Sequence, residues 1–213
     1  ACTDAWKLLA ERPMPDTFLE ALDTIGMPES WYRCDGAEAG QFVDSLGAHR
    51  GYTTASLTTG PGMCAASSAS LRLPQITPPS DDAPAGAMIP VTAPTDLALR
   101  GLFWTVAMWV QFTERGNLGA GGNRLLSLEL GSGWAASTFR AISIGMNNAT
   151  GRPGMAVNGG STVGITVTGN VLDEDGSPFD MCDGRPHWLV CQRSSTTLRI
   201  YVNGRLAREF THA

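Results

Sequence analysis

Two acidic residues in the segment 169–186 have a spacing that could support hydrolysis. Enzymes that cleave glycosidic bonds use a pair of carboxyl groups, and acids at alternate positions of a strand point to the same face. Asp173 and Asp175 show this alternation, but Gly176 and Pro178 follow them and indicate a loop. We therefore interpret them as solvated loop acids and expect a protein that is not an enzyme. A glycan hydrolase or lyase that uses these acids is the alternative.

The same segment contains the best candidate metal site. Asp173, Asp175 and Asp180 offer carboxylate oxygens, which are the ligands that calcium prefers. Complete calcium-binding loops carry a longer acidic series, so plain solvated acids are the competing interpretation. The sequence suggests Ca²⁺ as a candidate ligand and no other cofactor.

A sugar-binding site is the third chemistry for which residues are present. Such sites use an exposed aromatic ring for stacking and nearby amide or carboxylate groups for the hydroxyls. Trp134 stands among glycines, and Asn147 and Asn148 occupy the next loop. We take these three residues as candidate ligand-binding residues. In the alternative interpretation Trp134 closes one end of the fold and the two asparagines form a turn.

Histidine and cysteine patterns do not indicate catalysis or zinc binding. His187 adjoins an apolar run and is interpreted as structural, and no nucleophile elbow accompanies any histidine. No Cys-x-x-Cys pair occurs, so no zinc site is expected. We expect buried or half-buried free thiols, with a Cys34–Cys64 disulfide as the alternative. The five cysteines are Cys2, Cys34, Cys64, Cys182 and Cys191.

Charge and hydropathy narrow the class of protein. The formal net charge of −5 and the scattered basic residues argue against nucleic-acid binding, which needs a basic surface. The most apolar run, residues 101–112, is shorter than the roughly twenty residues that cross a bilayer. No membrane span is expected, and no basic-then-apolar signal peptide is visible at the start of the sequence.

The clearest structural signal is a hairpin near the end of the sequence. Asn203-Gly204 is the pair that tight hairpin turns favour, because both positions adopt positive φ. The run before it places Leu198, Ile200 and Val202 on one face of a strand. The run after it continues the alternation through Leu206, Arg208 and Phe210, and a further turn precedes residue 198.

Residues 103–112 are expected to form the central strand. Apolar side chains fall on both faces, so the strand is predicted to be covered on both faces, with its aromatic rings in the core rather than on a ligand platform. One face contains Trp104, Val106, Met108, Val110 and Phe112, and the other contains Phe103, Ala107 and Trp109.

Many short strands separated by turn residues predict an all-β fold, an antiparallel β-sandwich. Residues 1–29 differ, because apolar side chains at helical spacing follow Asp16 and end at Gly26 and Pro28. We expect a helical lead-in or connector over residues 1–29 and a sandwich domain over residues 30–213.

Three segments in this order resemble the laminin-G-like branch of the concanavalin A-like jelly-roll superfamily. The first is Trp31-Tyr-Arg-Cys-Asp-Gly, continued by Val43-Asp-Ser-Leu-Gly47 and Gly51. The second is Phe103-Trp-Thr-Val-Ala-Met-Trp-Val. The third is His187-Trp-Leu-Val with Leu198-Arg-Ile-Tyr-Val-Asn-Gly204. The resemblance implies a jelly roll, and calcium is a frequent ligand in that superfamily.

The sequence departs from the family pattern in two ways. His187 and Trp188 stand in reversed order, and the family continues past this hairpin with strands that close the sandwich. The domain is therefore expected either to be incomplete at its C-terminus or to be completed by another chain or segment.

The resemblance also suggests a function. A jelly roll after a short helical lead-in is similar to domains in tail proteins of bacteriophages that infect actinobacteria. We expect a non-catalytic module on a virion, in the tail or at the particle surface, that recognises host-cell glycan or contacts neighbouring subunits. A homo-oligomer or a larger assembly is the expected state. The alternative is a carbohydrate-binding domain of a secreted or cell-surface bacterial protein.

Overall fold

The computed structural model describes part of the chain, and that part is built from antiparallel β-strands. The described residues are 32, 41–42, 51–53, 58–63, 69–72, 87–88, 103–113, 123–129, 140–147, 150–158, 164–169, 172, 176 and 178–211. They contain no helix, and their strands confirm the predicted all-β class. The expected lead-in, residues 1–29, lies outside them, so the predicted division at residue 30 stays a prediction.

The chain divides into two compact units. The first comprises Ala1–Pro74 and Pro84–Leu97, and the second comprises Gln75–Ala83 and Ala98–Ala213. In the first unit β1, β2 and β5 form one small sheet, and β3 pairs with β4. The bounds are β1 (Gln41–Phe42), β2 (Gly51–Thr53), β3 (Thr58–Pro61), β4 (Ala69–Arg72) and β5 (Ala87–Met88).

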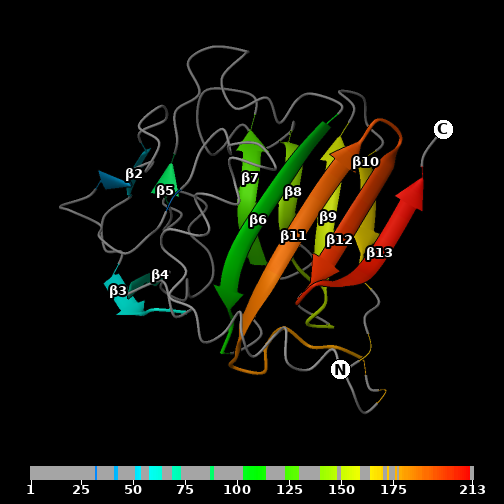
Figure 1. Cartoon of the computed structure of the whole chain (residues 1–213). Coiled ribbons are helices and arrows are strands. Elements are labelled where there is room, and N and C mark those ends of the chain that lie inside the picture. The colour runs from blue at the N-terminus through cyan, green and yellow to red at the C-terminus, as the bar shows by residue number, and fades with distance from the viewer. Residues whose placement is uncertain are drawn as a thin grey trace, which may run out of the picture. The chain divides into compact units, whose positions relative to one another are not determined.

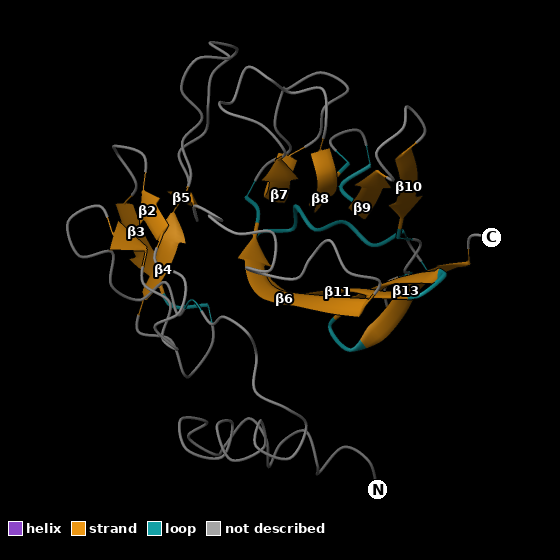
Figure 2. Ribbon diagram, turned by 90° about the horizontal axis from the view of Figure 1, so that it is seen from above, coloured by secondary structure: helices purple, strands orange, loops and turns teal. Residues whose placement is uncertain are grey.

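The second unit contains two four-stranded antiparallel sheets that face each other (Figures 1 and 2). The order of the first sheet is β13-β12-β11-β6, and the order of the second is β10-β9-β8-β7. The strands of the first are β6 (Phe103–Gln111), β11 (Pro186–Ser194), β12 (Thr197–Val202) and β13 (Arg205–Thr211). Those of the second are β7 (Asn123–Glu129), β8 (Arg140–Met146), β9 (Pro153–Asn158) and β10 (Gly164–Thr168).

Both sheets contribute their inner faces to one apolar core. Side chains at alternate positions point inward, as the two-residue period of a strand requires, and Ile144 from one sheet and Ile200 from the other are fully buried. Each such side chain contributes roughly 1.5–3 kcal/mol through removal from water. The other core residues include Ile142, Met146, Met155, Val157, Leu189, Leu198 and Val202.

Both predicted turns of the C-terminal region are confirmed. Asn203 and Gly204 have φ of 50° and 79°, and they connect β12 to β13. Positive φ at both positions matches the right-handed twist of the two strands. The second turn, at Ser195 and Thr196, connects β11 to β12, and Ser195 also has positive φ.

The predicted unbroken alternation in the last strand is wrong. The register of β12 with β13 shifts between Ile200 and Tyr201. As a result Ala207 is buried, Leu206 is 52% exposed, and Phe210 packs against the core. A bulge adds a residue to one strand and changes the face to which the following side chains point.

The predicted covering of both faces of β6 is also wrong. Trp104 and Val110 are buried as expected, but Phe103 and Trp109 on the other face are 69% and 39% exposed. The reason is that the opposite sheet packs against the inner face of β6, to which Trp104 and Val110 belong, whereas Phe103 and Trp109 lie on the outer face. β6 is also the last strand in the order of its sheet and not the predicted central strand.

Replacement of Ile144 by Ala should lower the free energy of unfolding of the second unit by about 2–5 kcal/mol, because the change leaves a cavity in the shared core. The measurement is urea-induced unfolding followed by tryptophan fluorescence. Ser143→Ala, at the half-buried neighbouring position of β8, is the matched control and should change the free energy little. Equal effects of the two variants would contradict the assignment of the inner face.

Candidate functional site

Two of the six sequence-predicted site residues lie within the described residues. Asn147 follows β8, and Asp180 precedes β11. The structure brings them to one corner through Gly151, which contacts both. Trp134, Asn148, Asp173 and Asp175 lie outside the described residues.

Asn147 organises the turn between β8 and β9. Its side-chain Oδ1 accepts a hydrogen bond from the Thr150 backbone N–H (3.1 Å), and its carbonyl accepts from the N–H of Gly151 (2.8 Å). Its own N–H donates to the Arg152 carbonyl (2.9 Å). These bonds give Asn147 a turn-forming role, and its ligand-binding role stays a prediction.

Gly151 joins this turn to the segment that contains Asp180. Its φ of +67° favours glycine, and a Cβ at this position would overlap the Asp180 carboxylate. Its carbonyl accepts from the Met181 N–H (2.8 Å), and Asp180 Oδ1 accepts from the Cys182 N–H (2.9 Å). The two segments are therefore locked together at one end of the sheets.

The proposed calcium ligands are only partly described. A β-bridge between Leu172 and Pro178 spans the segment that contains Asp173 and Asp175. Asp180 already accepts a backbone hydrogen bond. Within the described residues, no three acidic, histidine or cysteine side chains gather as metal ligands. The calcium site stays a prediction.

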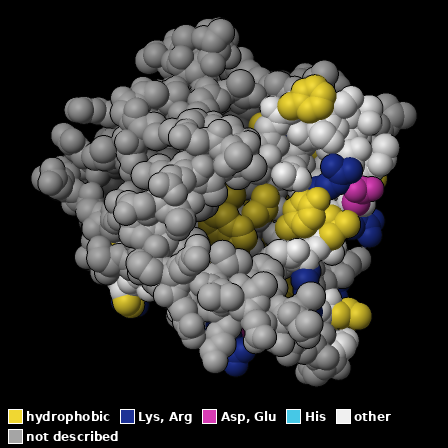
Figure 3. All heavy atoms as spheres, in the orientation of Figure 1, with side chains coloured by type: hydrophobic (Ala, Val, Ile, Leu, Met, Phe, Trp, Pro, Cys, Tyr) yellow, Lys and Arg dark blue, Asp and Glu magenta, His cyan; other side chains and the backbone are white. Residues whose placement is uncertain are grey.

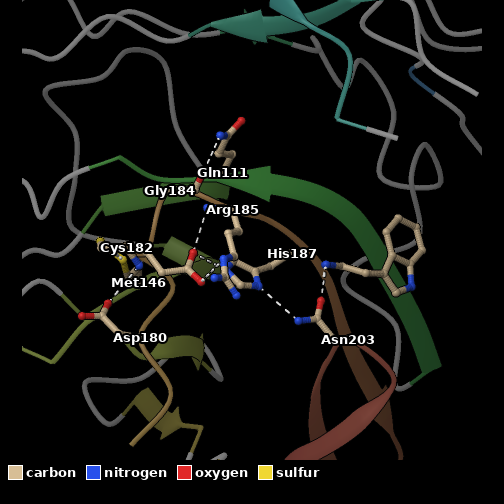
Figure 4. A network of polar contacts seen from close by, with 10 residues as sticks. Gln111, Met146, Asp180, Cys182, Gly184, Arg185, His187 and Asn203 are labelled. Atoms are coloured by element: carbon tan, nitrogen blue, oxygen red, sulfur yellow. Dashed lines mark hydrogen bonds and ion pairs between the residues drawn. The ribbon is translucent and has the colours of Figure 1, made fainter. Parts of the chain in front are cut away.

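His187 is the buried centre of a polar network at this end of the first sheet (Figure 4). It is 3% exposed, and its Nε2 lies 2.8 Å from Asp183 Oδ1. Its Nδ1 lies 3.1 Å from the amide nitrogen of Asn203. The edge of the Phe179 ring packs against it at 4.9 Å between centroids. Both ring nitrogens are thus occupied by partners from two different turns.

The Asn203 amide determines which His187 nitrogen carries the proton. Asn203 Oδ1 accepts from the Trp188 N–H at 2.9 Å, so Nδ2 is directed at the imidazole. Because Nδ2 can only donate, Nδ1 must accept, and we infer that the proton lies on Nε2 and is donated to Asp183.

The Asp183 carboxylate also holds the chain that follows it. Its Oδ1 accepts from the Arg185 N–H at 2.8 Å. Partial burial acts to raise the pKa of Asp183, but hydrogen bonds from Arg185 and His187 and the nearby Arg185 charge lower it below 3.8 overall. Gly184 extends the network, since its N–H donates to the Phe112 carbonyl and its carbonyl accepts from Gln111 Nε2.

The two cysteines of the described residues are free thiols, as predicted for them. Burial raises the pKa of Cys191 to about 12, so its thiol is unreactive at neutral pH. Cys182 lies 3.2 Å from the Met146 sulfur. The alternative disulfide, Cys34–Cys64, lies outside the described residues.

The outer face of the first sheet presents a pair of tryptophans. Trp109 of β6 and Trp188 of β11 are directly opposite each other in the register. Their rings are 5.3 Å apart at 47°, and Trp109 is 39% exposed. The backbone N–H and carbonyl of Trp188 both bond to Asn203 (2.9 Å each), so the hairpin turn holds this tryptophan in place.

Two further rows of side chains cross the same face beside the tryptophans. The first row is Ala107, Val190, Tyr201 and Leu206, and the second is Thr105, Gln192, Arg199 and Glu209. In the second row, Gln192 Nε2 donates to Thr105 Oγ1 (3.4 Å), and Arg199 Nε donates to Glu209 Oε2 (2.6 Å). We call the tryptophan pair and these two rows the outer face. In Figure 3, hydrophobic side chains lie beside a basic and acidic pair on the visible side of these strands.

Sequence reasoning missed the tryptophan pair for a specific reason. The alternation of side chains puts Trp109 on the face of β6 that points away from the core. The residue that contacts it in space, Trp188, is distant in sequence. The pairing of β6 with β11, which no local pattern encodes, brings the two rings together.

Comparison with protein-family models and with curated proteins gives no match to this chain. Within the residues that the structure describes, no helix is long and apolar enough to span a membrane.

Gly151→Ala should destabilise the second unit more than Gly184→Ala. Both glycines have positive φ, which costs an alanine about 1–2 kcal/mol, but only at Gly151 does the added Cβ meet a neighbour, the Asp180 carboxylate. Urea unfolding of the two variants measures the difference. Gly151→Ala combined with Asp180→Ala should recover part of the excess loss, and equal losses in the two single variants would contradict the contact.

Acid should weaken the fold partly through Asp183. Because the pKa of Asp183 is lower in the folded state than its ordinary 3.8, the stabilisation is complete above that value and is lost as pH falls through the folded-state pKa. Asp183→Asn keeps an oxygen acceptor but no charge, so its stability should fall less steeply below about pH 4. Unfolding midpoints across the acid range compare the two proteins. A difference that does not vary with pH would contradict this role.

Proposed function

We propose that this chain is a non-catalytic glycan-recognition module of a virion surface, with a laminin-G-like, concanavalin A-type jelly roll. The two facing antiparallel sheets of the second unit support this fold. Two of the three family-like segments also support it. They fall on β6, β11 and the β12–β13 hairpin, which are neighbours in one sheet.

The tryptophan pair of the outer face, in which Trp109 is exposed and Trp188 is half-buried, carries the glycan part of the proposal. Indole rings offer a broad apolar face to the C–H groups of a sugar ring, and polar side chains beside them can bond its hydroxyls. Trp109 is exposed, the Trp188 backbone is held by Asn203, and Gln192 lies four residues along β11 from Trp188. A rigid aromatic surface with adjacent polar groups suits sugar stacking.

Two reactive groups that the structure describes, His187 and Cys191, are buried in the fold, which supports a non-catalytic module. The imidazole of His187 is buried and has both nitrogens engaged. The thiol of Cys191 has a pKa of about 12. Each of these groups stabilises the fold where it stands, and neither faces the tryptophan pair.

The virion location rests on the resemblance of the quoted segments to phage tail domains. Genes for other tail or capsid proteins beside the coding sequence would support it. A chromosomal setting without phage genes, or a signal peptide encoded upstream, would instead favour a secreted or cell-surface carbohydrate-binding domain that uses the same outer face.

Trp109→Ala and Trp188→Ala should each weaken binding to glycan by about fivefold or more, because truncation of an aromatic residue that anchors a ligand costs over ~1 kcal/mol. The measurement is retention of labelled protein on a glycan array and on host-cell envelopes. Phe103→Ala is the matched control, since Phe103 is a more exposed aromatic at the far end of the same strand face. Failure of the unaltered protein to retain any glycan would contradict the proposed function.

A further inference from the structure

We propose that the outer face binds an uncharged oligosaccharide, with one ring on the Trp109–Trp188 pair and the hydroxyls of a further ring at Gln192 and Arg199. This inference rests on the proposed function and adds the length and charge of the ligand. It follows from the order of the three rows across the strands.

The register fixes the sequence of surfaces along the strands. Trp109 and Trp188 are opposite each other, Ala107 pairs with Val190 two residues further, and Thr105 pairs with Gln192 two residues beyond that. Since a strand rises about 3.4 Å per residue, the polar row lies about 13–14 Å from the tryptophan row. A single sugar ring cannot reach both rows, so the ligand must extend over about two rings or more.

The middle row suits a sugar chain that passes over it. Ala107 and Val190 are short side chains, and Ala107 is exposed. Tyr201 is opposite Val190 on β12, and its ring is half-buried. Together they form an apolar surface with an aromatic edge, which allows continuous contact between the stacking row and the polar row.

The polar row offers both donors and acceptors for hydroxyl groups. Gln192 and Thr105 contact each other at 3.4 Å, which is a weak hydrogen bond that a ligand hydroxyl can replace. Arg199 and Glu209 form an ion pair of 2.6 Å. The Glu209 hydrogen bond and charge raise the pKa of Arg199, so the guanidinium stays charged.

Charge complementarity selects an uncharged ligand. The three rows contain one cation and one anion, Arg199 and Glu209, and these neutralise each other. An acidic glycan would have to compete with Glu209 for Arg199. A basic ligand would have to compete with Arg199 for Glu209. A neutral glycan can bond to the pair without separating it.

The test uses the whole chain on an array of neutral and acidic glycans that runs from monosaccharides to longer oligosaccharides, followed by calorimetry with the retained glycans. Neutral oligosaccharides should be retained, with affinity that rises at least tenfold from one ring to the longer chains. Gln192→Ala and Arg199→Met should each weaken binding about three- to tenfold, as expected for loss of a hydrogen bond. Ser194→Ala, further along β11 on the same face, is the matched control and should bind like the unaltered protein.

Several results would overturn the inference, and they are distinguishable from failure of the proposed function. If glycan is bound and Trp188→Ala abolishes binding, but Gln192→Ala and Arg199→Met do not weaken it, the function stands and the extended site is wrong. If acidic glycans or monosaccharides are retained as well as neutral oligosaccharides, the function likewise stands and the extended site is wrong. If no glycan is retained, both proposals fail. If sedimentation shows self-association that Trp188→Ala removes, the face binds a second copy of the chain instead.

Discussion

The pairing of β11 with β6 along the whole length of both strands is the constraint on which the second unit depends. All nine residues of β11, from Pro186 to Ser194, have a partner in β6, and β12 pairs on its other side. Because side chains alternate along a strand, this single register sends His187, Leu189 and Cys191 into the core and Trp188 and Gln192 outward. A slip of one residue would exchange the core and the outer face.

The end of this sheet shows how a few polar groups hold several turns in place. His187 bonds to Asp183 from the preceding loop and to Asn203 from the hairpin turn. Asn203 in turn bonds to the backbone of Trp188. A buried imidazole with both nitrogens satisfied thereby fixes the backbone of Trp188, which is half-buried on the outer face. The stability of the network and the geometry of the outer face are linked through Asn203.

Local patterns predicted the strands and turns of the second unit well, for a physical reason. The Asn203-Gly204 turn depends on the φ preferences of two neighbouring residues, and the inward set of β12 depends on a period of two. Both are encoded within a few positions. The bulge that buries Ala207 was missed because it arises between strands, where the register of β12 and β13 shifts.

The candidate site was predicted less well, because it is made from residues distant in sequence. Alternation alone separates Trp109 from the inward residues of β6, yet its exposure depends on the opposite sheet, which covers only the inner face. Its partner Trp188 was noted only as part of a family-like segment. The corner at Gly151 shows the same limit, since the close approach of Asp180 is visible only after two separate segments fold together.

The amino-acid sequence by itself determined the all-β class, the hairpin turns and the alternation of the strands that pack the core. These features depend on backbone preferences and on side-chain periodicity over short distances. Only the tertiary structure decided which strands are neighbours and which face of β6 is open to solvent, and with them the pairing of Trp109 with Trp188. These features depend on the burial of whole sheets, to which residues far apart in the chain contribute jointly.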